Sequence, residues 1–563
     1  MTILTRGAYA RPETSLDFKT GTWRVERPVH HHRNAPCHVA CPAGEDAQAY
    51  LASLEEAGPR AAWETLVAAN PLPAVTGRVC HHPCESACNR RDYDESISIH
   101  NVERFLGDEA LRQGWDYPGI PARRDGDAVA VVGAGPAGLA AAYHLLRLGH
   151  PVTVFDKLPL AGGTLRTAIP QYRLPRDILD KEMERILASG MEFRAHHILG
   201  RDVSLAELQA EYARVFVAPG CQEGRAWSID GVTPSDLHPG ITQLQEWIAV
   251  GAAPEARSVA ILGGGNTAMD MARVMRRTGT KEVHVITHKA IPGPGVPAAD
   301  TMPAIEREVR QAIEEGVVVH EHRGVHRLIL RGQKVIGVEI VHMKKMIQEN
   351  GRLKRIAFEG TETVLHVDQV IPAVGQVVER HGLGTILPKG RDYLQADDLG
   401  RVFQHPKLYT GGDARGDRGT VAEAVGDGRR AAAAMHADLN GVELVPEVKS
   451  QPIGIEQLNL NYFEHAPAPE EKVLPVEERG ETEEIEGGIT ARQAAAEAVR
   501  CFSCGNCFAC DNCWTLCPDN SVLKTRDVAT DGTHYVFDYD YCKGCGMCAN
   551  ECPCGFIEMV VEA

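Results

Sequence analysis

One glycine-rich segment constrains the fold of this chain more than any other feature. Residues 128–132 alternate small and branched apolar side chains, which is typical of a buried parallel strand. The sequence GAGPAG follows at 133–138, and the small residues after it predict a helix over 139–148. Glycines at this spacing allow a tight turn, let backbone amides approach a pyrophosphate and let the helix pack closely on the strand. A second strand over 151–155 ends at Asp156, an acid placed to bind ribose hydroxyls, so the segment predicts a dinucleotide-binding Rossmann domain.

A second motif of the same kind lies in the middle of the chain. The turn GGGNTA follows a predicted strand over 258–262 and precedes a predicted helix over 269–278. The next strand, 282–286, ends in Thr-His-Lys without a carboxylate, so His288 and Lys289 are placed to receive a 2′-phosphate. The sequence leaves NADH and NADPH both open. Two such motifs, one inserted in the other's domain, predict FAD in the first and NAD(P) in the second.

Composition narrows the class of protein. A chain of 563 residues should hold several domains, and 44% hydrophobic residues with 55 glycines fit packed α/β domains. The net charge of −17 argues against nucleic acid and anionic membrane surfaces as partners. No secretory signal pattern and no membrane-length apolar run are present, so we expect no membrane insertion and a cytoplasmic location. The 17 cysteines fall in clusters, which in such a chain favours metal binding over disulfides.

The C-terminal cysteines match the spacing of a bacterial ferredoxin with two [4Fe–4S] clusters. In this pattern the fourth cysteine of each run binds the other cluster. The spacing therefore predicts two ligand sets: Cys507, Cys510, Cys513 and Cys552 for one cluster, and Cys542, Cys545, Cys548 and Cys517 for the other. Zinc is the alternative that this spacing disfavours. Cys501 and Cys504 extend the run, which leaves open a shifted register in which Cys504 replaces one of the first three ligands, and Cys554 is left over.

A second group of cysteines lies near the N-terminus. Cys37 and Cys41 are separated by three residues, and Cys80, Cys84 and Cys88 repeat that separation. Thiolates this close need a soft metal, and because the spacings are not the CxxC pairs of structural zinc sites, iron–sulfur is the favoured interpretation. The histidine run at 30–32 is expected to be a solvated loop, and the lone Cys221 is expected to be structural.

Three segments of this region resemble a known domain. CPAGED at 41–46, NPLPAVTGRVC at 70–80 and VERF at 102–105 resemble the N-terminal cluster domain of the glutamate synthase small subunit. The same domain occurs in dihydropyrimidine dehydrogenase and in the large subunit of the NADH-dependent ferredoxin:NADP oxidoreductase. The resemblance implies one [4Fe–4S] cluster, with ligands Cys41, Cys80, Cys84 and Glu103. A second cluster would use Cys37 and Cys88, but Val29 and His32 stand where the family has a further CxxC, so these two thiols hold a second cluster or else complete or flank the first.

The resemblance extends to the flavin-binding segments. AGGTL at 161–165 and IPQYRLP at 169–175 match the loop that lies along the flavin in the family, and LYTGGD at 408–413 matches its late flavin motif. A helix starting near 420 would aim its N-terminus at the flavin N1/O2 edge. The implied FAD contacts are Gly133, Gly135, Pro136, Ala137, Gly138, Asp156, Lys157, Gly163, Leu165, Arg173, Gly412, Asp413, Thr420, Val421 and Ala424. The implied NAD(P) contacts are Gly263, Gly264, Gly265, Asn266, Thr267, His288 and Lys289.

The predicted fold class is a multidomain α/β protein. It joins a helical iron–sulfur domain, two Rossmann-like domains with the NAD(P) domain inserted in the FAD domain, and a ferredoxin-like α+β module. The chain is expected to return to the FAD domain near residue 365, where 370–375 reads as another strand-end turn. The expected ranges are 1–124 for the iron–sulfur domain, 125–225 and 365–445 for the FAD domain, 226–364 for the NAD(P) domain, 446–490 for a linker and 491–563 for the ferredoxin module.

The predicted parts imply an electron-transfer enzyme. Nicotinamide exchanges two electrons as hydride and a [4Fe–4S] cluster exchanges one, so the flavin must stand between them. We expect an NAD(P)H:ferredoxin-type oxidoreductase without acid–base catalytic residues. Its partner is a soluble ferredoxin or the other subunits of a redox complex, such as a 2-oxoacid oxidoreductase, an aromatic acyl-CoA reductase or a sulfite-reductase system.

Other functions fit the sequence less well. One alternative is a glutamate synthase small subunit, although that subunit usually lacks the ferredoxin module. Another is a non-catalytic conducting or scaffolding subunit, against which the intact glycine turns argue. A thioredoxin reductase is excluded, because no cysteine lies between Cys221 and Cys501 to form a redox CxxC facing the flavin.

Overall fold

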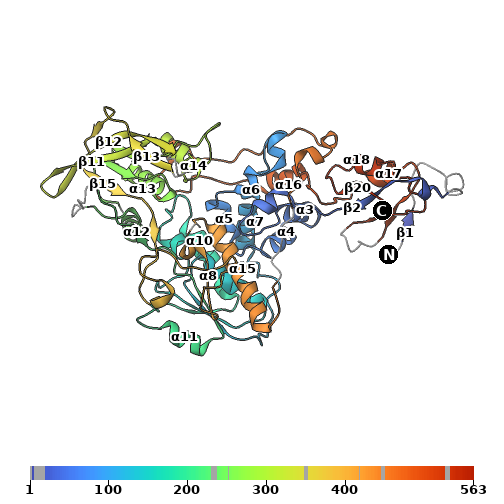
Figure 1. Cartoon of the computed structure of the whole chain (residues 1–563), viewed down its shortest axis with the longest axis horizontal. Coiled ribbons are helices and arrows are strands. Elements are labelled where there is room, and N and C mark those ends of the chain that lie inside the picture. Colours follow the sequence, from blue (N-terminus) through green and yellow to red (C-terminus); the bar gives the residue numbers. More distant parts are fainter. Residues whose placement is uncertain are drawn as a thin grey trace. The chain divides into compact units, whose positions relative to one another are not determined.

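The computed structural model divides into two compact units (Figure 1). It describes residues 3–5, 19–229, 237–251, 253–347, 353–416, 419–444, 451–526 and 533–562. The terminal unit comprises Met1–Tyr117, Val445–Glu471 and Gly488–Ala563, and the central unit comprises Pro118–Leu444 and Lys472–Gly487. The described part of the predicted linker is therefore shared between the two units, with 472–487 in the central one.

The first sheet of the central unit is entirely parallel. Its strands, in spatial order, are β17 (Leu408–Thr410), β6 (Arg214–Val217), β3 (Val129–Val132), β4 (Val152–Phe155) and β5 (Glu192–Arg194). Figure 1 shows α8 (Pro136–Arg147) and α15 (Val421–Asn440) side by side, and a Cβ added at Gly428 of α15 would lie 2.3 Å from the carbonyl oxygen of Ala137. This is the predicted first Rossmann domain.

The second sheet is also parallel. Its strands are β10 (Val318–His320), β9 (Glu282–Ile286), β8 (Ser258–Leu262) and β15 (Gln369–Pro372), and its helices include α12 (Gly240–Val250), α13 (Asn266–Arg277) and α14 (Glu306–Glu314). The expected return to the FAD domain near residue 365 is wrong, because β15 pairs with β8. A short apolar strand ending in a glycine turn fits either sheet, and β15 holds the same position beside β8 that β6 holds beside β3.

Antiparallel strands and short helices complete the central unit. β11 (Arg323–Arg331), β12 (Lys334–Ile347), β13 (Leu353–Ala357) and β14 (Thr363–Leu365) form one sheet, and β7 (Glu223–Gly224) pairs with β16 (Gln376–Val377) where the chain crosses between the Rossmann domains. The helices α9 (Thr164–Thr167), α10 (Arg176–Ala188) and α11 (Leu205–Glu211) belong to the first Rossmann domain.

The cysteine-rich part of the terminal unit is helical, as predicted. Its helices are α2 (Pro36–Ala40), α3 (Ala47–Ala57), α4 (Pro59–Leu66), α5 (Pro73–Val79), α6 (Pro83–Ser86), α7 (Ile99–Gln113) and α16 (Ala491–Arg500). α5 packs tightly on α7, since a Cβ added at Gly107 would lie 2.3 Å from the amide nitrogen of Ala74. Within the described residues, no helix is both long and apolar enough to cross a bilayer.

The two ends of the chain form the ferredoxin-like part together. β18 (Val522–Thr525), β19 (Tyr535–Phe537) and β20 (Ile557–Val561) accompany the short helices α17 (Asn512–Thr515) and α18 (Met547–Asn550). β1 (Ile3–Thr5) pairs with β18, and β2 (Glu26–His30) pairs with β20, beside which it lies in Figure 1. The expectation of a solvated histidine loop holds for His31 and His32, which are exposed and outside any strand, but not for His30, which ends β2 and whose ring stacks on Phe556 at 5.0 Å. A strand completed by residues more than 500 positions away leaves no local signal in the sequence.

Candidate cofactor sites

The first glycine turn has the geometry of a phosphate-binding loop. Gly133 has φ +102°, and a Cβ on Gly138 would lie 1.9 Å from the carbonyl oxygen of Gly133, so neither position accepts a side chain. A Cβ at Gly135 would meet only the Cα of Gly163, at 4.0 Å. Gly135 caps α8 and Pro136 fills its first position, so the open space faces a helix N-terminus that favours an anion.

The acid that follows β4 is turned toward this glycine loop. The backbone N–H of Ala134 donates to Asp156 Oδ2 (2.6 Å) and that of Leu158 to Oδ1 (2.8 Å). Burial raises the pKa of Asp156. Each carboxylate oxygen keeps a lone pair for a further donor, so the residue fits a ribose hydroxyl. The neighbouring Lys157 instead forms an ion pair with Glu379 (2.6 Å).

Three segments meet where the late flavin motif lies. A Cβ at Gly412 would be 3.0 Å from the Cβ of Ala137 and 3.4 Å from that of Ala424, so the motif lies between α8 and α15. Burial raises the pKa of Asp413 to about 6, and the charges of nearby Glu423 and Asp427 add to the effect.

The N-terminus of α15 is held by a capping box. Thr420 Oγ1 accepts from the N–H of Glu423 (3.1 Å), whose carboxylate accepts from the N–H of Thr420. The helix therefore starts at Val421, as predicted. Leu165, another predicted contact, is buried in α9. Cys221, expected to be structural, donates its thiol to the backbone oxygen of Asp413 (3.1 Å).

Arg173, which the resemblance implies as a FAD contact, is engaged by two buried acids. Its Nη1 donates to both carboxylate oxygens of Asp270 (2.9 Å each), and its Nε lies 3.1 Å from Glu308 Oε1. Both acids belong to the second Rossmann domain. Arg273, fully buried, pairs with Glu308 and Glu315 and extends the network. Arg173 thus forms an ion-pair connection between the two Rossmann domains.

The second glycine turn repeats the geometry of the first. Gly263 has φ +139°, and a Cβ there would lie 2.3 Å from the carbonyl oxygen of Ala373. A Cβ at Gly264 would lie 2.6 Å from Thr287 Oγ1, whereas one at Gly265 would meet nothing within 4 Å. The turn therefore opens above the N-terminus of α13, which fits a second pyrophosphate.

The first two residues of α13 are fixed by neighbours. The side-chain oxygen of Asn266 accepts from the N–H of Ile305 (2.9 Å), and the Gln376 amide donates to Thr267 Oγ1 (3.2 Å). Both predicted contacts therefore lie on the rim of the second turn with fixed orientations.

Three cations surround His288 at the end of β9. Burial lowers the pKa of His288 to about 4, and the positive charges of Arg355, Lys289 and Lys345 lower it further. Lys345 pairs with Asp300, and Lys289 Nζ donates to the carbonyl oxygen of Ala299 (2.6 Å). The sequence predicted only His288 and Lys289, because the other two cations come from β12 and β13 and carry no motif of their own. We call His288, Lys289, Lys345 and Arg355 the basic group.

Cys41, Cys80, Cys84 and Glu103 come together in the terminal unit. Burial raises the pKa of Cys41 to about 12 and that of Cys80 as well, with the charge of Glu103 adding to both, and Cys84 interacts with both thiols. Glu103 is 4% exposed. Three thiols and one carboxylate, all buried except the partly exposed Cys41, fit a [4Fe–4S] cluster with one oxygen ligand.

A hydrogen-bonded amide links Glu103 to a second buried acid. Asn70 Nδ2 donates to Glu103 Oε1 (3.0 Å) and to Glu45 Oε1 (2.8 Å). Sequence reasoning missed Asn70 and Glu45, although both lie inside the segments that carry the resemblance. Groups of this kind orient a metal ligand and tune the potential of a cluster.

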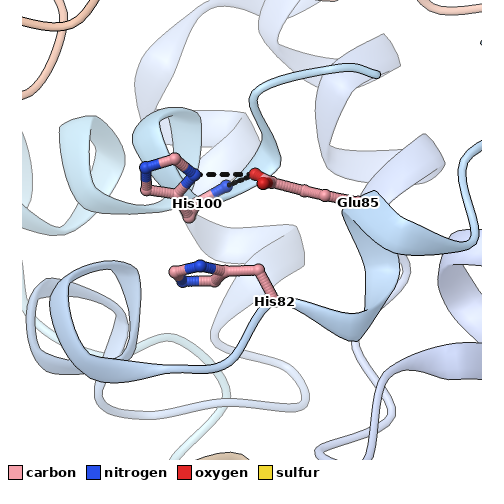
Figure 2. A group of neighbouring side chains, drawn as sticks. All are labelled: His82, Glu85 and His100. Atoms are coloured by element: carbon pink, nitrogen blue, oxygen red, sulfur yellow. Dashed lines mark hydrogen bonds and ion pairs between the residues drawn. The ribbon is translucent and has the colours of Figure 1, made fainter. Parts of the chain in front are cut away.

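His82, Glu85 and His100 lie close together in the terminal unit (Figure 2). Glu85 Oε1 accepts from the backbone N–H and from Nδ1 of His100 (2.8 and 2.7 Å), and the ring of His82 stacks on that of His100 at 4.5 Å. Burial opposes ionisation of Glu85, but His100 outweighs it and lowers its pKa to about 2. The N–H of His82 donates to Cys80 Sγ (3.3 Å), so the trio supports the thiol site.

One cavity joins the first predicted ferredoxin ligand set. Its lining includes all four predicted thiols, Cys507, Cys510, Cys513 and Cys552, together with Cys554. Four thiols around one cavity are the donor set of a [4Fe–4S] cluster. The leftover Cys554 lies 3.8 Å from Cys552, sulfur to sulfur.

The second ferredoxin set is also assembled. Burial raises the pKa of Cys548 to about 12, with added effects from the charges of Cys517, Cys542 and Cys545. The backbone N–H of Ser521 donates to Cys517 Sγ (3.3 Å), the kind of N–H···S bond that stabilises cluster thiolates. Cys37 and Cys88, by contrast, lie beside Cys501 and Cys504.

Three domain families match the chain. They are described as pyridine nucleotide-disulphide oxidoreductase (residues 127–428), dihydropyrimidine dehydrogenase domain II, 4Fe-4S cluster (25–115), and 4Fe-4S binding domain (535–558). These matches confirm the predicted cofactor classes: FAD, NAD(P) and [4Fe–4S] clusters.

Curated relatives are similar over most of the chain. The NADP(+)-dependent formate dehydrogenase subunit beta of Moorella thermoacetica is 33% identical over 84% of this chain and 70% of its own length. The NADPH-Fe(3+) oxidoreductase subunit beta of Geobacter sulfurreducens is 30% identical over 87% and 78%. The glutamate synthase [NADPH] small chain of Escherichia coli (strain K12) is 30% identical over 71% and 87%.

Proposed function

Because this chain belongs to the pyridine nucleotide-disulphide oxidoreductase family, we propose that it exchanges electrons between NADPH and a one-electron acceptor. In this proposal FAD occupies the first Rossmann domain, NADPH the second, and [4Fe–4S] clusters the terminal unit. The chain acts as the nucleotide-oxidising subunit of a larger complex. The acceptor is a partner subunit or a ferredoxin-type protein.

The chain contributes positioning and electrostatics to this chemistry. Bound flavin supplies the conversion of a hydride into single electrons. The amides at Gly135 and the N-terminus of α8 hold the FAD pyrophosphate, and Asp156 orients the ribose. The N-terminus of α15, fixed by Thr420 and Glu423, presents a partial positive charge that favours an electron-rich flavin edge.

The observation that supports NADPH is the basic group at the end of β9. No carboxylate ends this strand, which continues as Thr287, His288 and Lys289, so a ribose 2′-hydroxyl lacks its usual acceptor. A 2′-phosphate, in contrast, would meet three cationic donors, Lys289, Lys345 and Arg355, beside the neutral ring of His288. The names of the three relatives above each refer to NADP(+) or NADPH, which agrees with this choice.

A substitution in the basic group tests the cofactor choice. Replacing Arg355 by Gln removes one charged hydrogen bond, about 1.5–3 kcal/mol, so kcat/KM for NADPH should fall roughly 10- to 100-fold. The kcat/KM for NADH should change less than about 2-fold, because NADH lacks the 2′-phosphate. Lys334→Gln, an exposed lysine of the same β12 hairpin, is the matched control. Equal losses with both nucleotides would contradict the proposal.

Dye reduction separates this function from a scaffolding role. Anaerobic protein with FAD bound should reduce a one-electron dye with NADPH as donor. A protein that retains FAD but reduces no dye with NADPH or NADH would favour a non-catalytic conducting subunit. A partner copurified from the native source would then identify the acceptor.

A further inference from the structure

Two cysteines near residue 500 lie against the N-terminal helices. We propose that Cys501 and Cys504 join Cys37 and Cys88 as the four ligands of an additional [4Fe–4S] cluster. Cys501 and Cys504 thus supply the two ligands that are missing near the N-terminus, where Val29 and His32 stand in place of a CxxC. This inference rests on the proposed iron–sulfur function of the terminal unit and adds a ligand set to it.

Direct contacts place the Cys501–Cys504 loop beside Cys37 and Cys88. The side-chain amide of Asn89, the residue after Cys88, donates to Cys504 Sγ (3.5 Å). Cys37 packs in one apolar cluster with Cys504 and Phe502.

Hydrogen bonds from the N-terminal helices fix the same loop. Arg90 donates to the carbonyl oxygen of Arg500, and its guanidinium lies 4.9 Å from the ring centroid of Phe502. Gln48 Nε2 donates to Ser503 Oγ (2.8 Å). The loop is therefore held in place at both of its ends and its middle.

The backbone of this loop matches that of the ferredoxin ligand loops. In Cys501-Phe-Ser-Cys504 the third residue, Ser503, has φ +51°. The residues at the same position of two predicted cluster loops, Ala509 and Gly544, have φ +57° and +75°. A left-handed conformation is uncommon for serine and alanine and persists only where the surroundings require it. The shared conformation indicates a shared task, the presentation of two thiols to one cluster.

The four thiols are largely withdrawn from water. Cys504 is buried, and Cys37, Cys88 and Cys501 are partly buried. Neighbouring thiols in such a setting fit iron coordination, because ligand thiols bind as thiolates.

The spacing of the thiols favours a cluster over a single zinc ion. Four thiolates on one Zn²⁺ lie about 3.8 Å apart, since each Zn–S bond is about 2.3 Å in a tetrahedron. Across the described parts of the chain, the only trio of potential ligands within 4.8 Å of one another is His82, Glu85 and His100. No three of the four thiols are that close, and the same holds for the ferredoxin sets. The four thiols are therefore spread more widely than the ligands of one tetrahedral Zn²⁺.

The position of the site gives the cluster a role as a relay. Cys37 and Cys41 lie one turn apart, with the N–H of Cys41 donating to the carbonyl oxygen of Cys37 (3.1 Å). Cys41 belongs to the Glu103 site, whereas Cys504 is three residues from Cys507 of the first ferredoxin set. The proposed cluster thus connects these two sites, receiving one electron from one neighbour and giving one to the other.

Iron content tests the ligand assignment. Anaerobic wild-type protein should hold about 16 iron atoms per chain, as expected for four [4Fe–4S] clusters. The single variants C37S, C88S, C501S and C504S should each lose about four iron atoms. The double variant C37S/C501S should lose no more than either single variant, whereas C41S/C501S should lose about eight. C221S, a buried thiol of the central unit, is the matched control and should lose none.

Several outcomes would overturn the assignment. These are full iron content in C501S, a loss of about eight in C37S/C501S, and one zinc lost in place of iron. Low-temperature electron paramagnetic resonance of each single variant should show the other clusters unchanged, and their loss would also count against it. Bleaching of the flavin by NADPH, recorded on the same samples, reports on the proposed function independently of the iron count.

Discussion

Arg173 offers a direct test of how the two Rossmann domains are connected. The resemblance implies that it contacts FAD, whereas the structure engages it with Asp270 and Glu308 of the second domain. Replacing Arg173 by Met keeps much of its length and apolar stem but removes its charge. The two interpretations predict different losses, one of bound flavin and the other of stability.

The loss of stability expected for R173M follows from the burial of the ion pairs that Arg173 forms. The side chains of Arg173 and Asp270 are each 6% exposed and that of Glu308 is 3% exposed. Removing one partner of a buried ion pair leaves an uncompensated charge and costs about 3–5 kcal/mol. Domains of 150–250 residues lose about 2–4 °C in Tm per kcal/mol, so the lower bound corresponds to about 6–12 °C.

The loss of folding stability caused by R173M should depend on pH. Burial raises the pKa of Asp270, and Arg173 opposes that rise, so R173M raises it further above its unfolded value of 3.8. Between the two pKa values the folded state then binds more protons than the unfolded state, and stability falls as pH rises. The slope is up to about 1.4 kcal/mol per pH unit. R173M should therefore be closer to wild type at pH 5 than at pH 8.

The assay is anaerobic thermal unfolding followed by flavin fluorescence, with FAD content measured before heating. K181M removes an exposed pair with Asp177 on α10 and should change stability by less than about 0.5 kcal/mol. R173M/D270N should recover part of the loss, because the acid left behind is no longer charged. An unchanged Tm together with loss of FAD from R173M would refute the domain-connection reasoning and support a flavin contact.

Two further predictions concern the cofactor sites. The Cys545→Ala variant should hold about four fewer iron atoms and transfer electrons to the acceptor more slowly, while NADPH still bleaches its flavin. An unchanged iron content would refute the ligand assignment of the second ferredoxin cluster. Gly138→Ala places a Cβ 1.9 Å from the carbonyl oxygen of Gly133, and such overpacking costs about 1–3 kcal/mol. The variant should therefore contain less FAD than wild type after purification. A normal FAD content would contradict this prediction.

Short sequence patterns predicted the parallel strands and the ferredoxin ligand sets. The strands that became β3, β4, β8 and β9 lie within one residue of their predicted bounds, because buried parallel strands are short apolar runs ended by glycine turns. The cysteine spacings likewise predicted both ferredoxin sets, since ligands two or three residues apart must share a site.

The features that sequence reasoning missed depend on long-range pairing. Nothing in the segment 369–372 says which of two parallel sheets it will join. Lys345 and Arg355 reach His288 only because β12 and β13 fold back toward the end of β9. Arg173 sits in a motif that resembles a flavin loop, but its charge is matched by acids almost 100 residues later or more.

The N-terminal cysteines show how a departure from a family pattern can be compensated at a distance. Val29 and His32 occupy the places of the missing CxxC, and Val29 is committed to β2, which pairs with β20 near the C-terminus. That pairing brings the two ends of the chain together, and Arg33 N–H donates to the carbonyl oxygen of Gly505 (3.3 Å), next to Cys504. The strand that displaces the family's ligands thus belongs to the same contact that delivers the Cys501–Cys504 loop. In the proposed four-thiol site, the pairing of β2 with β20 thus accompanies the delivery of Cys501 and Cys504 to Cys37 and Cys88.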